Sequence, residues 1–306
     1  MVRLLSMTGP RVPIPAEPAD HPLRAALMRG DLLLERSGPA LLHRLGVRDD
    51  ALLGDAIVAH VGGMIGDIAR QLGEASDRSV SPDPDLWDRL ARLDGLREHC
   101  HALALEWRLT LALEAGAALD PVLSPMMQAA IARGEGAQDT LAMAALAAQA
   151  RYAQAQRRMQ HPLGELPAEL FDEVLRAALA AGAIDAAAEA QLRRGFEEGD
   201  GRLALIGRLV GDAHADVGDI ARIEDAGLAV WLSAVSARTG QTRDRVACAA
   251  ADPQLGRLLL TLRAAGLLPG EAERQALLLH PDAVLPRGLH DVGTREAAQW
   301  LAQASA

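Results

Sequence analysis

The sequence contains no lysine and no asparagine, and all 31 of its basic residues are arginine. Because the codons for lysine and asparagine are rich in A, a G+C-rich genome accounts for both absences. The arginines are therefore no evidence by themselves for sites that need a bidentate guanidinium. Acidic residues outnumber basic ones by 41 to 31, which gives a net charge of −10. This balance argues against nucleic acid as a partner, because nucleic-acid binding requires a concentrated basic surface.

Aromatic residues make up only 2% of the chain, whereas hydrophobic residues make up 50%. The core must therefore consist mainly of leucine, alanine, valine and methionine, which bury less area each, so that more helices are needed. No segment alternates β-branched and polar residues as a strand does. In the long helix expected over residues 86–116, one apolar stripe contains Leu86, Leu90, Leu93, Leu96, Cys100, Leu103, Trp107 and Leu111. The sequence predicts an all-α protein, an irregular array of helix hairpins in two packed halves.

Long apolar runs are also missing. No stretch approaches the roughly 18 uncharged apolar residues of a membrane-spanning helix, so no membrane contact is expected. The N-terminal residues contain prolines in place of the apolar centre of a signal peptide. The two cysteines, Cys100 and Cys248, lie in apolar helical patterns far apart and are expected to be free thiols. These features predict a cytoplasmic protein.

Prolines and glycines predict where helices begin and end. A short polar residue before proline is a typical helix start, and it occurs at Asp83-Pro84, Asp120-Pro121, Ser124-Pro125 and Asp252-Pro253. Three junctions, at residues 114–121, 180–187 and 263–270, combine a glycine with a new helix start and predict helix hairpins.

Four segments are expected along the chain. Residues 1–20 contain four prolines and are predicted to be a flexible arm. Two prolines and a glycine within residues 161–167 predict a boundary between an N-terminal helical domain, residues 21–162, and a C-terminal helical domain, residues 163–290. Residues 291–306 are predicted to be a short helix around Trp300 that docks on the domain, or alternatively a detachable tail.

A basic segment follows the middle of the chain. Three arginines lie between Asp139 and Glu165 without an intervening acid. On a helix over residues 139–160, a step of seven residues nearly returns to the same angle, so one face contains Arg151, Gln154 and Arg158. Together with Arg157 and His161, these residues form the predicted surface for binding another protein. The alternative is that the cations near the helix end only stabilise its negative pole, and that Pro162 stops the helix. An apolar face of the same helix is expected to contain Ala148, Tyr152, Ala155 and Met159.

Two stretches resemble a known family. They are AQARYAQAQRRMQHPLGELPAEL (residues 148–170) and DPQLGRLLLTLRAAGLLPGEAERQALLL (residues 252–279). Their amino-acid sequences resemble an alphaproteobacterial all-helical domain-of-unknown-function family, and the resemblance extends over roughly residues 86–282. The matching positions are Arg157, Arg158, Pro162, Leu163 and Pro167. The resemblance implies a bacterial, cytoplasmic, all-helical protein, and it supplies no activity, cofactor or ligand.

His60 supports an alternative function. It lies in a predicted helix just before Gly62 and Gly63, as the phosphoacceptor of a phosphotransfer helix does. The chain would then be a signalling phosphotransfer module or one that binds a response regulator. Phosphotransfer domains usually keep a lysine close behind the histidine, and this chain has none. Alternatively, His60 packs in the core and the glycines allow close helix contact.

No motif predicts a metal, a cofactor or a catalytic centre. His99 and His101 diverge by about 200° on a helix and cannot share an ion, so the segment is interpreted as a buried cysteine between two exposed histidines. Neither a phosphate-binding loop nor a nucleophile elbow occurs. A helical enzyme whose site forms only in three dimensions is the second alternative. It would require a deep pocket lined by several of His21, His43, His60, Asp67 and Glu106. The sequence thus favours a noncatalytic adaptor that binds another protein, such as a signalling component.

Overall fold

The computed structural model describes residues 21–32, 54–76, 84–134, 136–212 and 222–304. Every regular element in these ranges is a helix, as predicted. Residues 22–32 are helical. The α-helices that follow are α2 (Asp55–Ala75), α3 (Pro84–Ala91), α4 (Asp94–Ala117), α5 (Pro125–Arg133), α6 (Ala137–Arg157), α7 (Ala168–Ala180), α8 (Ala186–Arg194), α9 (Arg202–Asp212), α10 (Ile223–Ala226), α11 (Leu228–Thr239), α12 (Arg243–Ala251), α13 (Gly256–Ala264), α14 (Pro269–Leu279) and α15 (Thr294–Gln303). Short 3₁₀ turns are η2 (Leu163–Glu165), η3 (Glu198–Asp200) and η6 (Leu289–Asp291). The arm predicted over residues 1–20 lies outside the described residues.

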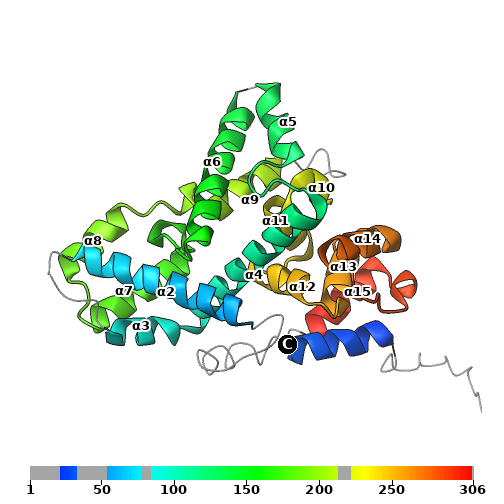
Figure 1. Ribbon diagram of the computed structural model, residues 1–306, viewed down its shortest axis with the longest axis horizontal. Coiled ribbons are helices and arrows are strands. Elements are labelled where there is room, and N and C mark those ends of the chain that lie inside the picture. Colours follow the sequence, from blue (N-terminus) through cyan, green and yellow to red (C-terminus); the bar gives the residue numbers. More distant parts are fainter. Residues whose placement is uncertain (1–20, 33–53, 77–83, 135, 213–221, 305–306) are drawn as a thin grey trace, which may run out of the picture.

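Helix α4 lies at the centre of the array (Figure 1). It contacts α2, α3, α6 and α7 as well as α11, α12 and α14, so helices cover it on several sides. Every residue from His99 to Trp107 is buried, which is typical of a helix surrounded by others. The prediction that His99 and His101 are exposed is therefore wrong, although Cys100 between them is buried as expected.

The long helix predicted over residues 86–116 is divided into α3 and α4. The division occurs at Arg92 and Leu93, where Leu93 has an extended backbone. The guanidinium of Arg97 donates to the carbonyl of Ala91 over 2.9 Å and so satisfies a group that the break leaves free. The predicted apolar stripe is buried or partly buried up to Trp107, whereas Leu111 is exposed although Leu109 and Leu113 on the same turns are buried.

Only some of the predicted helix starts are helix starts. Ser124 caps α5 through its hydroxyl, and Pro125 is the first helical residue. Asp120 and Asp252 instead close turns, because each carboxylate accepts hydrogen bonds from amides two or three residues further on. Short polar side chains stabilise both structures in the same way, so the sequence pattern alone did not distinguish them. Helix α3 begins at Pro84, and Asp83 lies outside the described residues.

Two of the three predicted hairpin junctions follow the predicted geometry. Gly182 and Gly266 have φ values of +69° and +96° directly after α7 and α13, where a left-handed residue ends a helix. At residues 114–121 the left-handed residue is Ala118, with φ 54°, and Gly116 lies within α4. The glycine was therefore the wrong marker for that helix end.

The N-terminal and C-terminal segments pack against each other. The helix over residues 22–32 approaches α13 so closely that a Cβ on Gly256 would lie 2.6 Å from the Cβ of Ala26. The buried side chains of Asp31 and Arg257 form an ion pair across the same contact. Helix α15 packs on α13, and Trp300 is buried there, so the terminal helix docks as predicted.

Buried apolar side chains form one continuous cluster that extends from Leu23 to Leu301. It includes Trp231, which is fully buried. Helices that precede residues 161–167 in sequence contact helices that follow them, for example α4 with α12 and α6 with α9. The domain boundary at residues 161–167 stays a prediction. Among the described helices, none combines the length and the apolar character needed to cross a bilayer.

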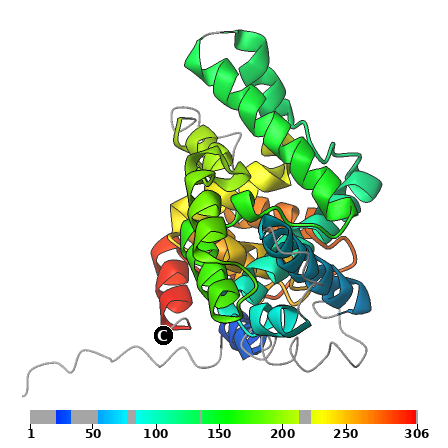
Figure 2. The same cartoon turned by 90° about the vertical axis from the view of Figure 1, so that its left-hand side faces the viewer.

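Helices α5 and α6 form a hairpin whose outer end projects from the body (Figures 1 and 2). The opposite end of α6 packs on α9 and α4. The projecting hairpin exposes side chains of α6 to solvent, while the opposite end of that helix is anchored.

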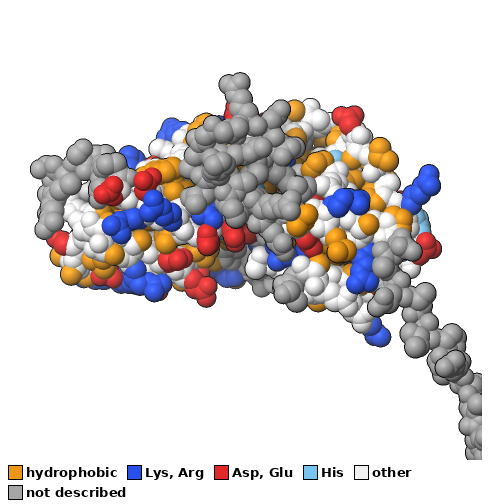
Figure 3. All heavy atoms as spheres, turned by 90° about the horizontal axis from the view of Figure 1, so that it is seen from below, with side chains coloured by type: hydrophobic (Ala, Val, Ile, Leu, Met, Phe, Trp, Pro, Cys, Tyr) orange, Lys and Arg blue, Asp and Glu red, His pale blue; other side chains and the backbone are white. Residues whose placement is uncertain are grey.

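On the face shown in Figure 3, arginine and acidic side chains are interspersed with hydrophobic ones.

Candidate binding site

The end of α6 forms a Schellman motif with an unusual residue. The amide of Gln160 donates to the carbonyl of Ala155, and the amide of Met159 donates to that of Gln156. Met159 has φ 54°, a left-handed conformation that normally favours glycine. Its Cβ lies against α2, where a Cβ on Gly63 would approach it to 2.6 Å. Gly63 thus allows close packing of the loop, as one interpretation of the α2 glycines predicted.

Two side chains of α2 hold the segment that follows α6. A carboxylate oxygen of Asp67 accepts from the amide of His161 over 3.1 Å. The amide group of Gln71 donates to the carbonyl of His161 over 2.9 Å and accepts from the amide of Leu163 over 3.0 Å. Because buried backbone groups need partners, these bonds fix the loop between α6 and α7. They also give Asp67 a structural role.

The predicted partner-binding residues divide into two groups. Arg151, Gln154 and Arg158 are exposed. Arg157 is also exposed, with its guanidinium 5.7 Å from the centre of the Trp107 ring. His161 is only 4% exposed and cannot contribute to a surface contact, because the loop bound by α2 turns its imidazole inward.

The apolar face predicted for α6 is confirmed in part. Ala148 and Tyr152 are buried, and the Tyr152 hydroxyl donates to the carbonyl of Leu103 over 3.1 Å. Ala155 is half-buried, and Met159 is 42% exposed because it lies beyond the last helical turn.

An exposed stripe runs along α6. Its members are all exposed and follow each other at steps of three or four: Thr140, Met143, Ala147, Arg151, Gln154 and Arg158. At about 100° per residue these positions fall within a narrow sector of the helix. Met143 is 52% exposed, which makes it one of the most exposed large apolar side chains described. We call this set the α6 stripe.

A cavity of about 370 Å³ opens beside the α6 stripe. Its wall combines residues of α4, α6, α9 and the segments that precede α7 and α9: His99, Leu103, Arg151, Tyr152, Ala155, Gln156, His161, Pro162, Gly164, Glu165, Gly195, Glu197, Asp200, Arg202 and Leu203. The volume lies within the range of small-molecule sites, roughly 300–1,000 Å³. Of the predicted surface residues, Arg151 and His161 line this cavity.

Two imidazoles in the cavity wall lie next to each other. The ring centres of His99 and His161 are 5.6 Å apart. The Nδ1 atom of His99 lies 2.8 Å from a carboxylate oxygen of Asp244. The Nε2 atoms of both histidines are buried, and neither has a hydrogen-bond partner among the described residues. Burial lowers the pKa of His161 well below its usual value, and the neighbouring His99 and Arg202 lower it further.

A buried ion cluster supports the cavity wall from behind. The carboxylate of Glu106 is 1% exposed and accepts hydrogen bonds from both Arg202 and Arg243 at 2.8–3.0 Å. Burial alone would raise the pKa of Glu106, but the two guanidinium groups lower it far below its usual value. Arg202 also lies 3.6 Å above the ring of Tyr152. The cluster joins α4, α9 and α12 and fixes Arg202 and Tyr152 in the wall.

His60 does not have the exposure of a phosphoacceptor. It is 8% exposed, and its Nε2 atom lies 2.9 Å from the side-chain oxygen of Gln156 on α6. Burial lowers its pKa, although the hydrogen bond opposes that shift. A response regulator would need access to this nitrogen, so the geometry favours the packing interpretation of His60.

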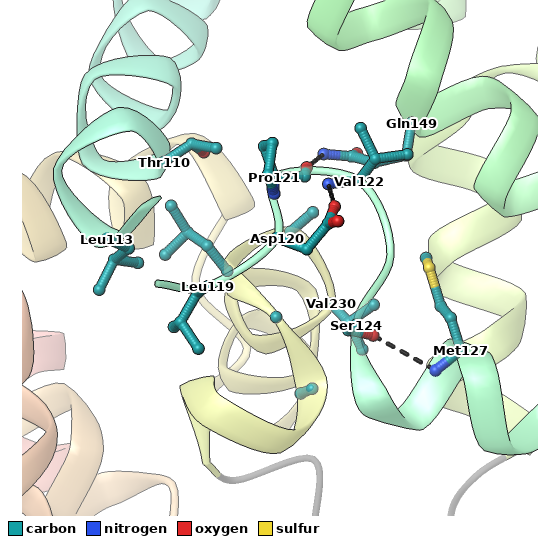
Figure 4. Close-up of a pocket in the computed structure, with 14 residues that line it drawn as sticks. Thr110, Leu113, Leu119, Asp120, Pro121, Val122, Ser124, Met127, Gln149 and Val230 are labelled. Atoms are coloured by element: carbon teal, nitrogen blue, oxygen red, sulfur yellow. Dashed lines mark hydrogen bonds between the residues drawn. The ribbon is translucent and has the colours of Figure 1, made fainter. Parts of the chain in front are cut away.

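A second, much smaller cavity lies where the connection after α4 meets α11 (Figure 4). It has a volume of about 30 Å³, enough for one or two waters. The side-chain amide of Gln149 donates to the carbonyl of Pro121 at its edge, and Asp120 closes the adjoining turn. This cavity lies between helices α4, α5, α6 and α11 and the connection after α4, and it is too small for an organic ligand.

The residues nominated for a hidden catalytic pocket do not gather in one place. His21 contacts Trp300, His60 binds Gln156, Asp67 holds the loop and Glu106 binds two arginines. None of these four lines the larger cavity, and His43 lies outside the described residues.

The described part of the chain contains no group of three histidine, cysteine or acidic residues arranged to hold a metal ion. Cys100 and Cys248 are free, and burial raises the pKa of each thiol to about 12.

Sequence reasoning missed the cavity and the ion cluster behind it. Glu106 is separated from Arg202 by 96 residues and from Arg243 by 137, so no local spacing could indicate their contact. Comparison of the chain with protein-family models, curated proteins and solved structures found no match in any of the three.

Proposed function

We propose that this chain is a noncatalytic adaptor that binds another protein through the α6 stripe. The observation that carries the proposal is the spacing of the exposed residues. Positions at steps of three and four form the row into which a second helix packs, as in coiled coils and helix-in-groove complexes. The partner segment is therefore an amphipathic helix lying along α6.

The side chains of the α6 stripe specify the chemistry of that partner. Met143 and Ala147 form its apolar part at the projecting end, where a flexible methionine can pack against varied surfaces. Arg151 and Arg158 form its basic part near the body. Arginine is common among the residues that dominate interface energies, and these two require acidic residues opposite them. The partner helix thus carries apolar residues at one end and acidic residues at the other.

The cellular setting belongs to the same proposal. A bacterial cytoplasmic protein is supported by free cysteines and by the family resemblance of residues 148–170 and 252–279. The α6 stripe contains two arginines and no acidic residue, whereas the chain as a whole has a net charge of −10.

A charge-reversal experiment tests the proposal. The double variant Arg151→Glu, Arg158→Glu is used as bait in extracts of the source organism, with recovered proteins quantified by mass spectrometry. Arg89→Glu, Arg92→Glu is the matched control, because both arginines are exposed on or directly after α3 and the change in charge is the same. We expect the stripe variant to lose a specific partner that the wild type and the control retain. Equal recovery of every protein by all three baits would refute the proposal.

A further inference from the structure

We propose that the 370 Å³ cavity beside α6 binds a small organic amine. This inference does not depend on the partner proposed above. It depends on the arrangement of polar nitrogen atoms and carboxylates around a cavity that opens to solvent and is partly lined by apolar residues.

The imidazole pair supplies two buried nitrogen atoms without hydrogen-bond partners in the wall. Asp244 can only accept a hydrogen bond when ionised, so the Nδ1 of His99 is the donor in that pair, and in the neutral ring its Nε2 is an acceptor. The Nε2 of His161 has no partner either. Both side chains are more than nine-tenths buried. Buried polar atoms without partners are rare, and they often indicate a missing water, ion or ligand. A ligand that donates a hydrogen bond satisfies the Nε2 of His99.

The charge of the wall favours a cation. Three carboxylates line the cavity, those of Glu165, Glu197 and Asp200, together with two guanidinium groups. One of the two, Arg202, shares the single buried carboxylate of Glu106 with Arg243, so this cluster keeps one positive charge, and the three carboxylates of the wall still outnumber it together with Arg151. The remaining cation, Arg151, is exposed and lies on the α6 stripe. The net charge of −10 also raises the local concentration of small cations.

The rest of the wall fits a hydrocarbon chain. Leu103, Ala155, Pro162 and Leu203 contribute apolar surface to the same wall. A short aliphatic diamine therefore has a place for its methylene groups as well as for both nitrogens. Apolar walls with a few placed polar groups are typical of small-molecule sites.

The test uses three four-carbon probes of matched length. Isothermal titration calorimetry of the purified chain compares 1,4-diaminobutane with the neutral 1,4-butanediol and the dianion succinate. We expect saturable binding of one diamine per chain and affinities about tenfold or more weaker for the other two probes. No saturable binding of the diamine would overturn the proposal. Equal binding of the diol, or tighter binding of succinate, would overturn it as well.

Variants then locate the site. Glu197→Gln, Asp200→Asn removes two exposed carboxylates of the wall, and neither is part of the hydrophobic core. Glu114→Gln, Asp282→Asn removes two exposed carboxylates outside the wall and serves as the control. We expect the first variant to weaken diamine binding about tenfold and the control to leave it unchanged. Unchanged affinity in the first variant, or an equal loss in both, would show that the diamine does not bind in this cavity.

Discussion

Replacing Glu106 with glutamine is expected to destabilise the fold strongly, although the substitution conserves side-chain size. The two carboxylate oxygens accept four hydrogen bonds from Arg202 and Arg243, all between 2.8 and 3.0 Å. Glutamine keeps the shape but removes the charge, and its amide nitrogen faces a guanidinium. Two largely buried cations are then left without a counterion.

The expected magnitude follows from the burial of the cluster. The side chains of Glu106 and Arg202 are 1% and 3% exposed, so water cannot replace the lost carboxylate. Removing one partner from a buried ion pair typically costs about 3–5 kcal/mol. Replacing all three residues with leucine or methionine removes every charge of this cluster, and such replacements are often neutral. We therefore expect the triple variant to be more stable than Glu106→Gln, which is strong non-additivity.

Urea unfolding followed by circular dichroism at 222 nm measures the free energy of unfolding of each variant. Glu114→Gln is the control, because Glu114 is exposed on the same helix and should change stability by less than about 0.5 kcal/mol. A loss below about 1 kcal/mol for Glu106→Gln would refute the reasoning. So would a triple variant whose loss equals the sum of the three single losses.

Three further predictions concern packing and pH. Gly63→Ala should lower the free energy of unfolding by about 1–3 kcal/mol, because the Cβ of Met159 is in its way. Gly73→Ala on the same helix should raise the free energy of unfolding by up to about 1 kcal/mol, because its Cβ would have no neighbour within 4 Å. The same urea assay tests both variants, and equal effects would contradict the close packing of Gly63 on Met159. Gly256→Ala should speed amide hydrogen exchange in residues 22–32 and leave the exchange rate in α6 unchanged, because the added Cβ would clash with Ala26. An unchanged exchange rate in residues 22–32 would count against this close contact. At pH values below about 6.5, the free energy of unfolding should decrease by at most about 1.4 kcal/mol per pH unit for each histidine whose pKa is lowered in the fold, because protonation is disfavoured in the folded chain and not in the unfolded one. A urea midpoint that does not change between pH 5.5 and 7.5 would disprove this prediction. The histidines with lowered pKa are His60, His161 and His280.

The sequence predicted the helical class correctly because apolar periodicity depends only on neighbours along the chain. Gly182 and Gly266 mark helix ends for the same local reason. The burial of His99 and His101 could not be inferred this way, because periodicity indicates one buried face and α4 is covered on several. Asp120 and Asp252 show a related limit, since the hydrogen bonds that start a helix also close a turn.

The candidate site was predictable only where it follows one helix. The spacing of Arg151, Gln154 and Arg158 correctly placed them on an exposed face of α6. His161 was assigned to the same surface because it follows the helix in sequence, but hydrogen bonds from α2 turn it inward. The cavity depends on contacts between helices far apart in the chain, which a single sequence does not reveal.

The most direct test of the proposed adaptor role is site-specific photocrosslinking in cells of the source organism. A photoreactive amino acid replaces Ala147 in the α6 stripe, and a control places it at Gln191, which is exposed on α8. The account predicts one discrete crosslinked protein at position 147, absent at position 191 and lost when Arg151 and Arg158 are also changed to glutamate. Identical crosslinking at both positions, or none at position 147, would contradict it.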